Sequence, residues 1–382
     1  MRESKDEKYD VIVAGSGPAG ISTAMHMARL IPSITGRMIV LEKENHPRKK
    51  LCGGGISANT DYWLKKLTIT LPIDSLELKR TRFVFDHDEY MEYVIHGGGL
   101  RTVSREEFDQ ALFHKAKSMG IHVLENEPVI SFSYKDNAVS VQTTKRSLET
   151  QVLVGADGVK SIIRRTLCGN SGIQEPRNTC STLSAILQVD KDRTPEHKYM
   201  EAVFDFSCTF KHEIMGYAWS FPLVVKDQAW LNTGVGGYNI SQCKEPSLQQ
   251  VFMEFLADTG ILVEKGRFEG HQIRWFNPLS IFSDYRVLLV GDAAGIDPLW
   301  GEGISFSLGY GEVAAISILN ALKSKDFSFA TYKEELLEHE IGQVLMEHSR
   351  LADELYRSQE TERTKEILLG LHGFESSYRS VW

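Results

Sequence analysis

The sequence predicts a mixed α/β fold with an inserted antiparallel β-sheet and a C-terminal helical segment. Three observations predict it. A short apolar run at residues 10–14 leads through a glycine-rich turn into a helical pattern. Residues 180–237 are dominated by strand-like segments of alternating character, and residues 330–382 carry apolar side chains near helical spacing. Together these patterns predict a Rossmann-like α/β domain that is interrupted by a second sheet and closed by packed helices.

The composition is that of an ordinary globular protein. The chain has 382 residues, of which 42% are hydrophobic and 25% are charged. This length favours two domains, or one large α/β domain with insertions. The formal net charge of −8 argues against a nucleic-acid binder, because such a protein needs a basic surface to displace counterions.

Cysteine usage and hydropathy indicate a cytoplasmic protein. The five cysteines are scattered and never form a C-x-x-C pair, so we expect reduced thiols and no metal site; they are Cys52, Cys168, Cys180, Cys208 and Cys243. The charged residues 1–9 lack the apolar core of a signal peptide. No stretch shows the roughly 20 apolar residues that span a bilayer, so we expect any contact with the inner membrane face to be peripheral.

The first motif is D-V-I-V-A-G-S-G-P-A-G at residues 10–20. Gly15 can make the tight turn, Gly17 lets the backbone approach a pyrophosphate, and Gly20 lets the next helix, residues 21–30, pack on the strand. A second strand, residues 37–41, ends at Glu42, about 20 residues further on, where a carboxylate can bind an adenosine ribose. A surface glutamate is the alternative, and the complete fingerprint favours the ribose.

A second glycine-rich segment, residues 45–57, is predicted to be a loop because glycine and charge dominate it. Gly53, Gly54 and Gly55 permit close approach of the backbone to a flat ligand or to another chain segment. A flexible surface turn is the alternative. Cys52, directly before these glycines, favours the functional interpretation because its thiol could face a bound ligand.

Other patterns predict the remaining elements. Strand-like runs at 81–85 and 89–95 predict a hairpin. Ser104 with Glu107 predicts a capping box for a helix that ends near Gly120. Further elements are predicted from apolar runs and caps: a strand and meander over 121–154, strands at 184–189, 199–206, 216–224, 228–235 and 285–290, and helices at 247–259 and 304–323.

Three strand-to-turn junctions, at residues 15–20, 155–158 and 291–303, indicate a dinucleotide held by several loops. Asp292 follows an apolar strand and can accept hydrogen bonds from ribityl or sugar hydroxyls. Asp157 occupies the equivalent place in the second junction. The helix start at residues 301–304 can point N–H donors at a ring atom that becomes negative on reduction. This arrangement suits a flavin, and FAD is therefore the predicted cofactor.

At these residues the chain resembles the FAD-dependent geranylgeranyl reductase family, within the p-hydroxybenzoate hydroxylase-like flavoproteins. The resemblance covers most of the first 325 residues, and five segments carry it: D-V-I-V-A-G-S-G-P-A-G at residue 10, L-E-K-E-N-H-P-R-K-K-L-C-G-G-G-I-S at 41, V-G-A-D-G-V-K-S at 154, G-Y-A-W-S-F-P at 216, and V-G-D-A-A-G-I-D-P-L-W-G-E-G-I at 290. We expect a discontinuous FAD-binding domain at residues 1–75, 100–178 and 270–325. The substrate sheet would span residues 76–99 and 179–269, and a helical region residues 326–382.

Carried over to matching positions, the resemblance implies a cofactor site and a substrate wall. The implied cofactor-binding residues are Gly15, Gly17, Ala19, Gly20, Glu42, Cys52, Gly53, Gly55, Arg105, Asp157, Asp292, Gly303 and Ile304. Cys52, Gly53 and Gly55 would line the reactive side of the flavin. Alternating side chains of one strand would form an aromatic wall, and the implied substrate residues are Tyr217, Trp219, Phe221, Pro222 and Trp300. Ordinary core packing is the alternative for these aromatics.

Two departures from the family pattern concern the substrate. The turn after Asp292 is one residue shorter than usual, because only Ile296 separates Gly295 from Asp297, and Trp300 stands where a small residue is expected. Both would narrow the cavity beside the flavin. The basic runs 48–50, 79–80 and 164–165 could meet a phosphate headgroup or an anionic membrane, although a solvated face is the more usual role of such runs.

The implied activity is saturation of isolated double bonds in an isoprenoid chain on a lipid, quinone or tetrapyrrole. An unactivated alkene accepts hydride poorly, so a proton must reach the other carbon. Cys52 is a candidate donor because a free thiol, with an ordinary pKa near 8.5, is mostly protonated at neutral pH; packing against the ring is an equal alternative. A flavin monooxygenase and a flavin electron-transfer protein are the rival functions. No second nucleotide fingerprint occurs, so NADPH and ferredoxin both stay open as electron donors.

Overall fold

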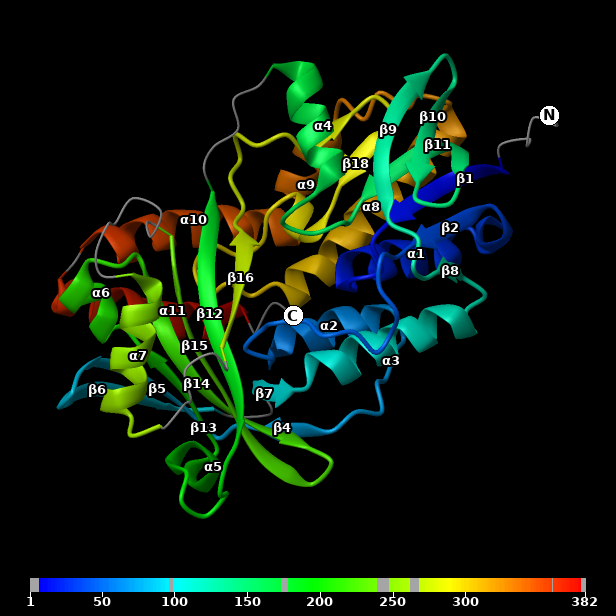
Figure 1. Ribbon diagram of the computed structural model, residues 1–382. Helices are drawn as coiled ribbons and strands as arrows, with labels where there is room; N and C mark the ends of the chain where they lie inside the picture. Colours follow the sequence, from blue (N-terminus) through cyan, green and yellow to red (C-terminus); the bar gives the residue numbers. More distant parts are fainter. Residues whose placement is uncertain are drawn as a thin grey trace.

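The computed structural model describes residues 7–95, 99–172, 178–238, 247–261, 268–358 and 360–378. Cys243 lies outside these ranges. An eight-stranded sheet occupies one half of the molecule, at the upper right of Figure 1, in the order β17-β18-β11-β1-β2-β8, with β10 and β9 continuing from β11. Its strands are β1 (Glu7–Ala14), β2 (Met38–Leu41), β8 (His122–Leu124), β9 (Val129–Lys135), β10 (Ala138–Thr143), β11 (Ser147–Gly155), β17 (Ser283–Asp284) and β18 (Val287–Leu289).

The central strands of this sheet pair in parallel, which confirms the predicted Rossmann-like unit. β1 pairs with β11 and β2, β2 pairs with β8, and β11 pairs with β18, all in parallel. β9 and β10 form an antiparallel hairpin beside β11. The carboxyl ends of β1, β2 and β18 therefore lie at one edge, where open α/β sheets bind their ligands.

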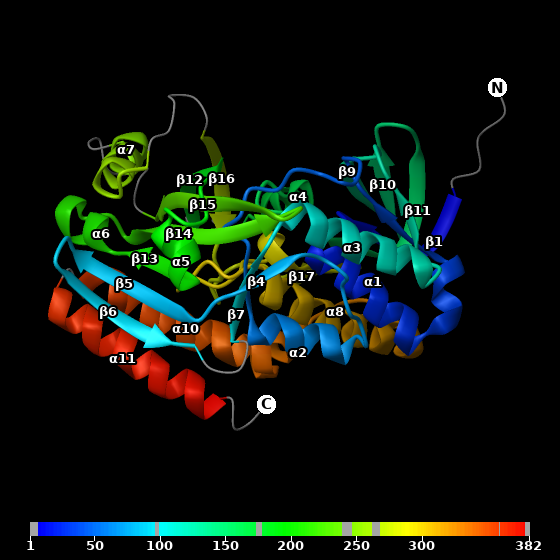
Figure 2. The same cartoon turned by 90° about the horizontal axis from the view of Figure 1, so that it is seen from below.

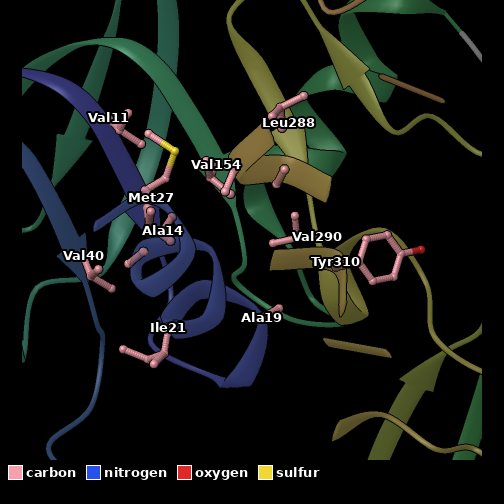
Figure 3. Close-up of a cluster of buried hydrophobic side chains, with 14 of the residues drawn as sticks. Val11, Ala14, Ala19, Ile21, Met27, Val40, Val154, Leu288, Val290 and Tyr310 are labelled. Carbon is pink, nitrogen blue, oxygen red and sulfur yellow. The ribbon is translucent and has the colours of Figure 1, made fainter. Parts of the chain in front are cut away.

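Two helices pack together against the sheet, namely α1 (Pro18–Leu30) and α8 (Ile304–Ser324). Figure 3 shows their apolar side chains, with those of Ile21, Met27 and Tyr310 labelled, among residues of the strands. The helices approach closely because Gly311 has no side chain, and a Cβ there would lie 2.3 Å from Ser22 Oγ. Ser22 Oγ also donates to the Leu308 carbonyl at 2.6 Å.

α8 is long and apolar enough to cross a membrane, the only such helix in the part of the chain that the structure describes. This differs from the expectation that no stretch reaches that length. However, 78% of its apolar window is buried inside the protein. Its hydrophobicity therefore serves the core, where burying one large aliphatic side chain contributes about 1.5–3 kcal/mol.

A seven-stranded sheet forms the other half, in the order β16-β12-β15-β14-β13-β5-β6. The strands are β5 (Arg80–Asp86), β6 (Glu89–Val94), β12 (Thr179–Gln188), β13 (Glu201–Asp205), β14 (Gly216–Val225), β15 (Gln228–Gly237) and β16 (Glu269–Arg274). The expected β5–β6 hairpin is confirmed. The sheet is not wholly antiparallel as predicted, because β13 pairs with β5 in parallel. The hairpin comes from an earlier part of the chain, so no tight turn fixes its direction beside β13.

Helices cover both faces of the seven-stranded sheet (Figure 2). On one face α7 (Leu248–Asp258) packs on β12 and β15, with the Ser247 and Gln250 capping box at its start. On the other face lie α10 (Glu340–Ser358) and α11 (Thr361–Tyr378), which follow α9 (Tyr332–Glu338). Packing of the C-terminal stripe on the main body is confirmed, because its members Leu336, Ile341, Leu345, Leu351 and Leu355 are buried.

A small sheet and several short helices join the two halves. The sheet contains β3 (Gly55–Ser57), β7 (Leu100–Val103) and β4 (Ser75–Glu77). α3 (Arg105–Ser118) follows with the predicted Ser104 cap, whose hydroxyl accepts from Glu107 N. The small sheet was not predicted, and β3 corrects the expectation of a loop through residue 57, because Gly55–Ser57 pairs with β7. Also not predicted were α2 (Ala58–Lys66), α4 (Ile162–Ser171), α5 (Pro195–Tyr199), α6 (Ser207–His212) and the 3₁₀ turns η1 (Pro32–Gly36) and η2 (Gly291–Ala293). β16 extends past the expected domain boundary at residue 269.

Candidate active site

One cavity of about 440 Å³ brings together most of the predicted site residues. It lies where the glycine-rich turns of the eight-stranded half meet one face of the seven-stranded sheet. The eight-stranded half and its turns contribute Cys52, Gly53, Gly55, Arg105, Asp292, Trp300, Gly303 and Ile304, and the sheet contributes Tyr217, Trp219 and Phe221. The other predicted residues do not line the cavity, namely Gly15, Gly17, Ala19, Gly20, Glu42, Asp157 and Pro222. The Pro222 carbonyl accepts a hydrogen bond from the Thr102 hydroxyl instead.

The first glycine turn has the geometry of a phosphate-binding loop. Gly15 adopts a φ of +109°, and a Cβ there would lie 2.2 Å from the Ala156 carbonyl oxygen. Gly20 likewise lies against Gly15, whose oxygen would be 2.0 Å from an added Cβ. Gly17, the N-cap of α1, is open, with only an Arg48 nitrogen at 3.5 Å from the position of its Cβ. The free N–H groups at the start of α1 can therefore meet an anion.

Glu42 is buried beside this turn and is held as a carboxylate. It accepts hydrogen bonds from Ser16 N at 2.8 Å and Ser16 Oγ at 2.6 Å, and a third from Glu44 N at 3.0 Å. Burial alone would raise the pKa of Glu42, but the Ser16 hydrogen bonds and the charge of Arg48 lower it overall. An ionised acceptor at the end of β2 fits the expected ribose contact.

Two arginines approach the same region and share one buried acid. Arg48 Nη2 lies 2.9 Å from Asp109 Oδ2, and Arg105 Nη2 lies 3.0 Å from Asp109 Oδ1. Burial would lower the pKa of Arg105, but Asp109 raises it overall, so the guanidinium stays charged. Arg48 Nε is buried without a hydrogen-bond partner among the described residues. The guanidinium as a whole lies beside Gly17, whose Cβ position is 3.5 Å from Arg48 Nη2, and a cation at this place suits a phosphate oxygen.

The usual interpretation of residues 48–50 as a solvated face is wrong for two of them. The side chains of Arg48 and Lys50 are only 11% and 22% exposed, whereas that of Lys49 is 66% exposed. Lys50 Nζ lies 2.9 Å from His271 Nε2 and 3.8 Å from Asp292 Oδ2. Burial lowers the pKa of Lys50, and Asp292 offsets part of this effect. These contacts could not be predicted from the sequence, because the partners are distant along the chain.

Asp157 is engaged in a local role. Its Oδ2 accepts from Ile162 N at 2.7 Å and so satisfies the start of α4. The backbone of its turn does contribute to the site, because Ala156 packs against Gly15. Asp292, in contrast, lines the cavity directly in front of Gly303, the N-cap of α8. No side chain caps α8, so its first N–H groups are available to a ligand at the cavity wall.

The aromatic wall depends on the strand next to it. Tyr217 lies opposite Gly236, Trp219 opposite Gly234 and Phe221 opposite Asn232 across the β14–β15 pair. A Cβ at Gly234 would lie 2.3 Å from Trp219 Cζ2. The indole therefore lies over a position where only glycine fits.

Asn232 connects this wall to the Cys52 loop. Its Oδ1 accepts from Trp219 Nε1 at 3.1 Å, and its Nδ2 donates to the Cys52 carbonyl at 2.6 Å. Asn232 and Gly234 were not among the residues predicted from the sequence. The pattern G-V-G at residues 234–236 was the available signal, because glycine inside a strand marks a close approach.

The shortened turn after Asp292 is built around Asp297, which is fully buried. This carboxylate accepts from Leu299 N at 2.9 Å, Trp300 N at 3.0 Å and Glu302 N at 3.3 Å. It also faces His348 Nδ1 of α10 at 2.8 Å. Trp300 consequently projects toward the sheet, with its ring 5.7 Å from that of Phe204. Trp300 lines the cavity from this turn, and a narrower cavity than in the family stays a prediction.

One group of side chains outside the cavity has metal-ligand character. In the described ranges, ligand atoms of Glu312, His339 and Glu340 lie within 4.8 Å of one another. However, Lys66 Nζ lies 2.6 Å from Glu312 and 3.2 Å from Glu340. A lysine already neutralises these acids, so the group is an ion-pair network between α2, α8 and α10.

Comparison with known proteins identifies a family. The FAD binding domain family matches residues 8–335. The chain is 25% identical over 328 residues to digeranylgeranylglycerophospholipid reductase 2 of Methanothermobacter thermautotrophicus, covering 83% of this chain and 79% of that protein. It is 26% identical over 324 residues to geranylgeranyl diphosphate reductase of Rhodobacter capsulatus, and the match covers 83% of this chain and 76% of that protein. The resemblance to geranylgeranyl reductases is thereby confirmed.

Solved structures agree with the fold. A geranylgeranyl bacteriochlorophyll reductase-like protein from Thermoplasma acidophilum has a TM-score of 0.76 at 21% identity, covering 95% of this chain and 91% of that one. PqsL of Pseudomonas aeruginosa, described as a probable FAD-dependent monooxygenase, has a TM-score of 0.68 at 16% identity. The match covers 95% of this chain and 100% of that one. The unpaired Arg48 nitrogen, the open Gly17 and the ionised Glu42 fit FAD in chemical type. The chain belongs to the FAD binding domain family and is an FAD-dependent oxidoreductase.

Proposed function

We propose that this protein saturates isolated C=C bonds of an isoprenoid chain carried by a lipid, quinone or tetrapyrrole. The observation that carries the proposal is the aromatic wall of Tyr217, Trp219 and Phe221, which faces the glycine turns across one cavity. A polyisoprenoid has no polar groups along its chain, so only apolar contact and shape can position it. The names of the reductase relatives support the same substrate class.

Different residues of the site would bind the cofactor and shape the space for the substrate. Arg48 and the start of α1 would hold the pyrophosphate, and Glu42 the adenosine ribose. Asp292, Gly303 and Ile304 would hold the ribityl chain and the ring. When bound and reduced, FAD supplies a hydride. Cys52, Gly53 and Gly55 would shape the reacting side of the cavity, where Phe221 carbon atoms lie 3.1 and 3.2 Å from the position of a Gly53 Cβ.

Trp219 has the most constrained place on the substrate side. Its indole is fixed by Asn232 and by the absence of a side chain at Gly234. A fixed ring can hold a flexible chain at one double bond, which supplies the positioning that alkene reduction needs. Trp300 closes the same space from the opposite direction, so we infer that it selects the shape of the chain.

The test is anaerobic reduction of the purified holoprotein followed by a panel of prenylated acceptors. Reduction by NADPH and by reduced ferredoxin would be compared as the electron source. A product two hydrogens heavier by mass, formed together with reoxidised flavin, is the expected result. Reoxidation that requires oxygen, with an oxygen atom in the product, would instead identify a monooxygenase. Reoxidation by other proteins but by no prenyl compound would identify an electron-transfer flavoprotein.

A further inference from the structure

We propose that Glu302, rather than Cys52, donates the proton in this reduction. The inference rests on the proposed function and names the acid that works with the flavin hydride. Glu302 lies in the turn directly before α8, between the two glycines Gly301 and Gly303, and its side chain lines the same cavity as Trp219 and Cys52. An acid at this place borders both the predicted flavin contacts and the aromatic wall.

The Glu302 carboxyl is held in a fixed position. Its Oε1 accepts a hydrogen bond from the Ser57 hydroxyl, which lies at the end of β3. Its backbone N–H donates to Asp297 at 3.3 Å, which fixes the turn from the other side. The residue is half-buried and lines the cavity. Its approach to the cavity therefore does not depend on a mobile segment.

The surroundings of Glu302 favour the protonated acid. Burial raises the pKa of Glu302 above its usual range, although hydrogen bonds with Ser305 and Ser57 lower it in part. Of the smaller charge effects, Asp297 raises the pKa and His348 lowers it. Within the described part of the chain no lysine or arginine forms an ion pair with it. A partly desolvated carboxyl without a lysine or arginine partner keeps its proton to higher pH, as a general acid at neutral pH requires.

The Cys52 sulfur is engaged in contacts with its own loop and with α3. The Arg105 guanidinium lies beside the sulfur, and Gly54 N donates a hydrogen bond to Cys52 Sγ at 3.4 Å. These contacts hold the sulfur in the wall of the cavity. Cys52 then shapes the cavity, while the proton comes from the carboxyl.

The proposed step balances with reduced FAD as the two-electron reductant. The O–H bond of Glu302 breaks, and the π electrons of the alkene form a C–H bond with that proton. The neighbouring carbon receives the hydride, so the alkene gains two hydrogens and the flavin is oxidised. Glu302 is left as a carboxylate and regains its proton from water before the next turnover.

The test compares E302Q, E302D and C52A as FAD-loaded proteins. Glutamine keeps the size and the acceptor for Ser57 but has no acidic proton. We expect E302Q to bind FAD and to be reduced normally, while prenyl-driven reoxidation in a single turnover slows by about 10²–10⁴-fold, the usual contribution of a general acid. E302D should recover part of the rate. E302Q should also lose the solvent deuterium isotope effect, whereas C52A should retain it.

A second measurement does not depend on turnover. Infrared difference spectra of wild type and E302Q at neutral pH should show the carbonyl stretch of a protonated carboxylic acid in the wild type alone, and C52A should retain this band. If E302Q reoxidises at the wild-type rate with an unchanged isotope effect, or if the band is absent, the inference is overturned. If the wild type itself reduces no prenyl compound, the proposed function fails, and the band still reports on Glu302.

Discussion

Replacement of Gly234 by alanine tests whether the place of Trp219 depends on the strand beside it. The new Cβ would lie 2.3 Å from Trp219 Cζ2 and 2.6 Å from the Leu183 carbonyl oxygen. The first distance is about 1 Å shorter than an ordinary contact of 3.4 Å. The carbonyl belongs to the neighbouring strand β12 and cannot rotate away, so the indole must move. Overpacking of this kind costs about 1–3 kcal/mol.

The assay is chemical unfolding combined with prenyl-driven reoxidation of reduced flavin. We expect G234A to lose about 1–3 kcal/mol of unfolding free energy and to need more substrate for half-maximal rate, while FAD affinity stays unchanged. G270A is the matched control, because Gly270 lies in the same sheet and its added Cβ would come no closer than 3.5 Å to any atom. If G234A matches G270A in stability and substrate dependence, the reasoning about the indole is refuted.

Three further changes test other parts of the molecule. E42Q should weaken FAD binding by about 10–100-fold, because hydrogen bonds to charged groups contribute about 1.5–3 kcal/mol; fluorescence titration with FAD measures this, and an unchanged affinity would exclude the ribose contact. Burial would raise the pKa of Glu312, but hydrogen bonds from His339 and Lys66 lower it to about 2. Because the pKa of Glu312 is lower in the folded protein, the carboxylate stabilises the fold fully at pH values above its ordinary pKa of 4.5. This stabilisation is lost as the pH falls toward 2. Thermal unfolding between pH 6 and pH 3 should show that loss in wild type and less of it in E312Q; equal slopes would contradict it. W300A should admit bulkier prenyl acceptors without changing FAD content, and an unchanged acceptor range would argue against Trp300 as a selector.

The parts of the site that sequence could predict are those fixed by local backbone geometry. Gly15 and Gly20 are required by close backbone contacts within a few residues of one another or of the adjoining strand, and the aromatic alternation of residues 217–221 follows from strand geometry alone. Asn232 and Glu302 escaped prediction because their partners, Trp219 and Ser57, are brought to them by pairing and packing of distant segments. The same limit explains why the neutralising partners of residues 48–50 were not foreseen.

Asp157 shows a different limit, since its motif has two physical solutions. A carboxylate in a turn between a strand and a helix can bind a ligand or accept the first N–H groups of the helix. The two roles have the same local sequence, and only the orientation of the side chain separates them. Asp157 accepts a hydrogen bond from Ile162 N at the start of α4, whereas Asp292 lines the cavity.

Contacts from helix α10 hold the turn at residues 297–303, which lies between β18 and α8. The family match ends at residue 335, before α10 begins. The Asp297 carboxylate accepts hydrogen bonds from N–H groups of the turn, and its Oδ1 lies 2.8 Å from His348 Nδ1 of α10. Tyr356, on the same helix, donates to the Leu299 carbonyl at 2.6 Å. Trp300 and Glu302 are therefore placed by contacts outside the matched domain. Among the described residues the phosphate loop makes none of these contacts, so we expect changes in α10 to displace Trp300 and Glu302 without disturbing that loop.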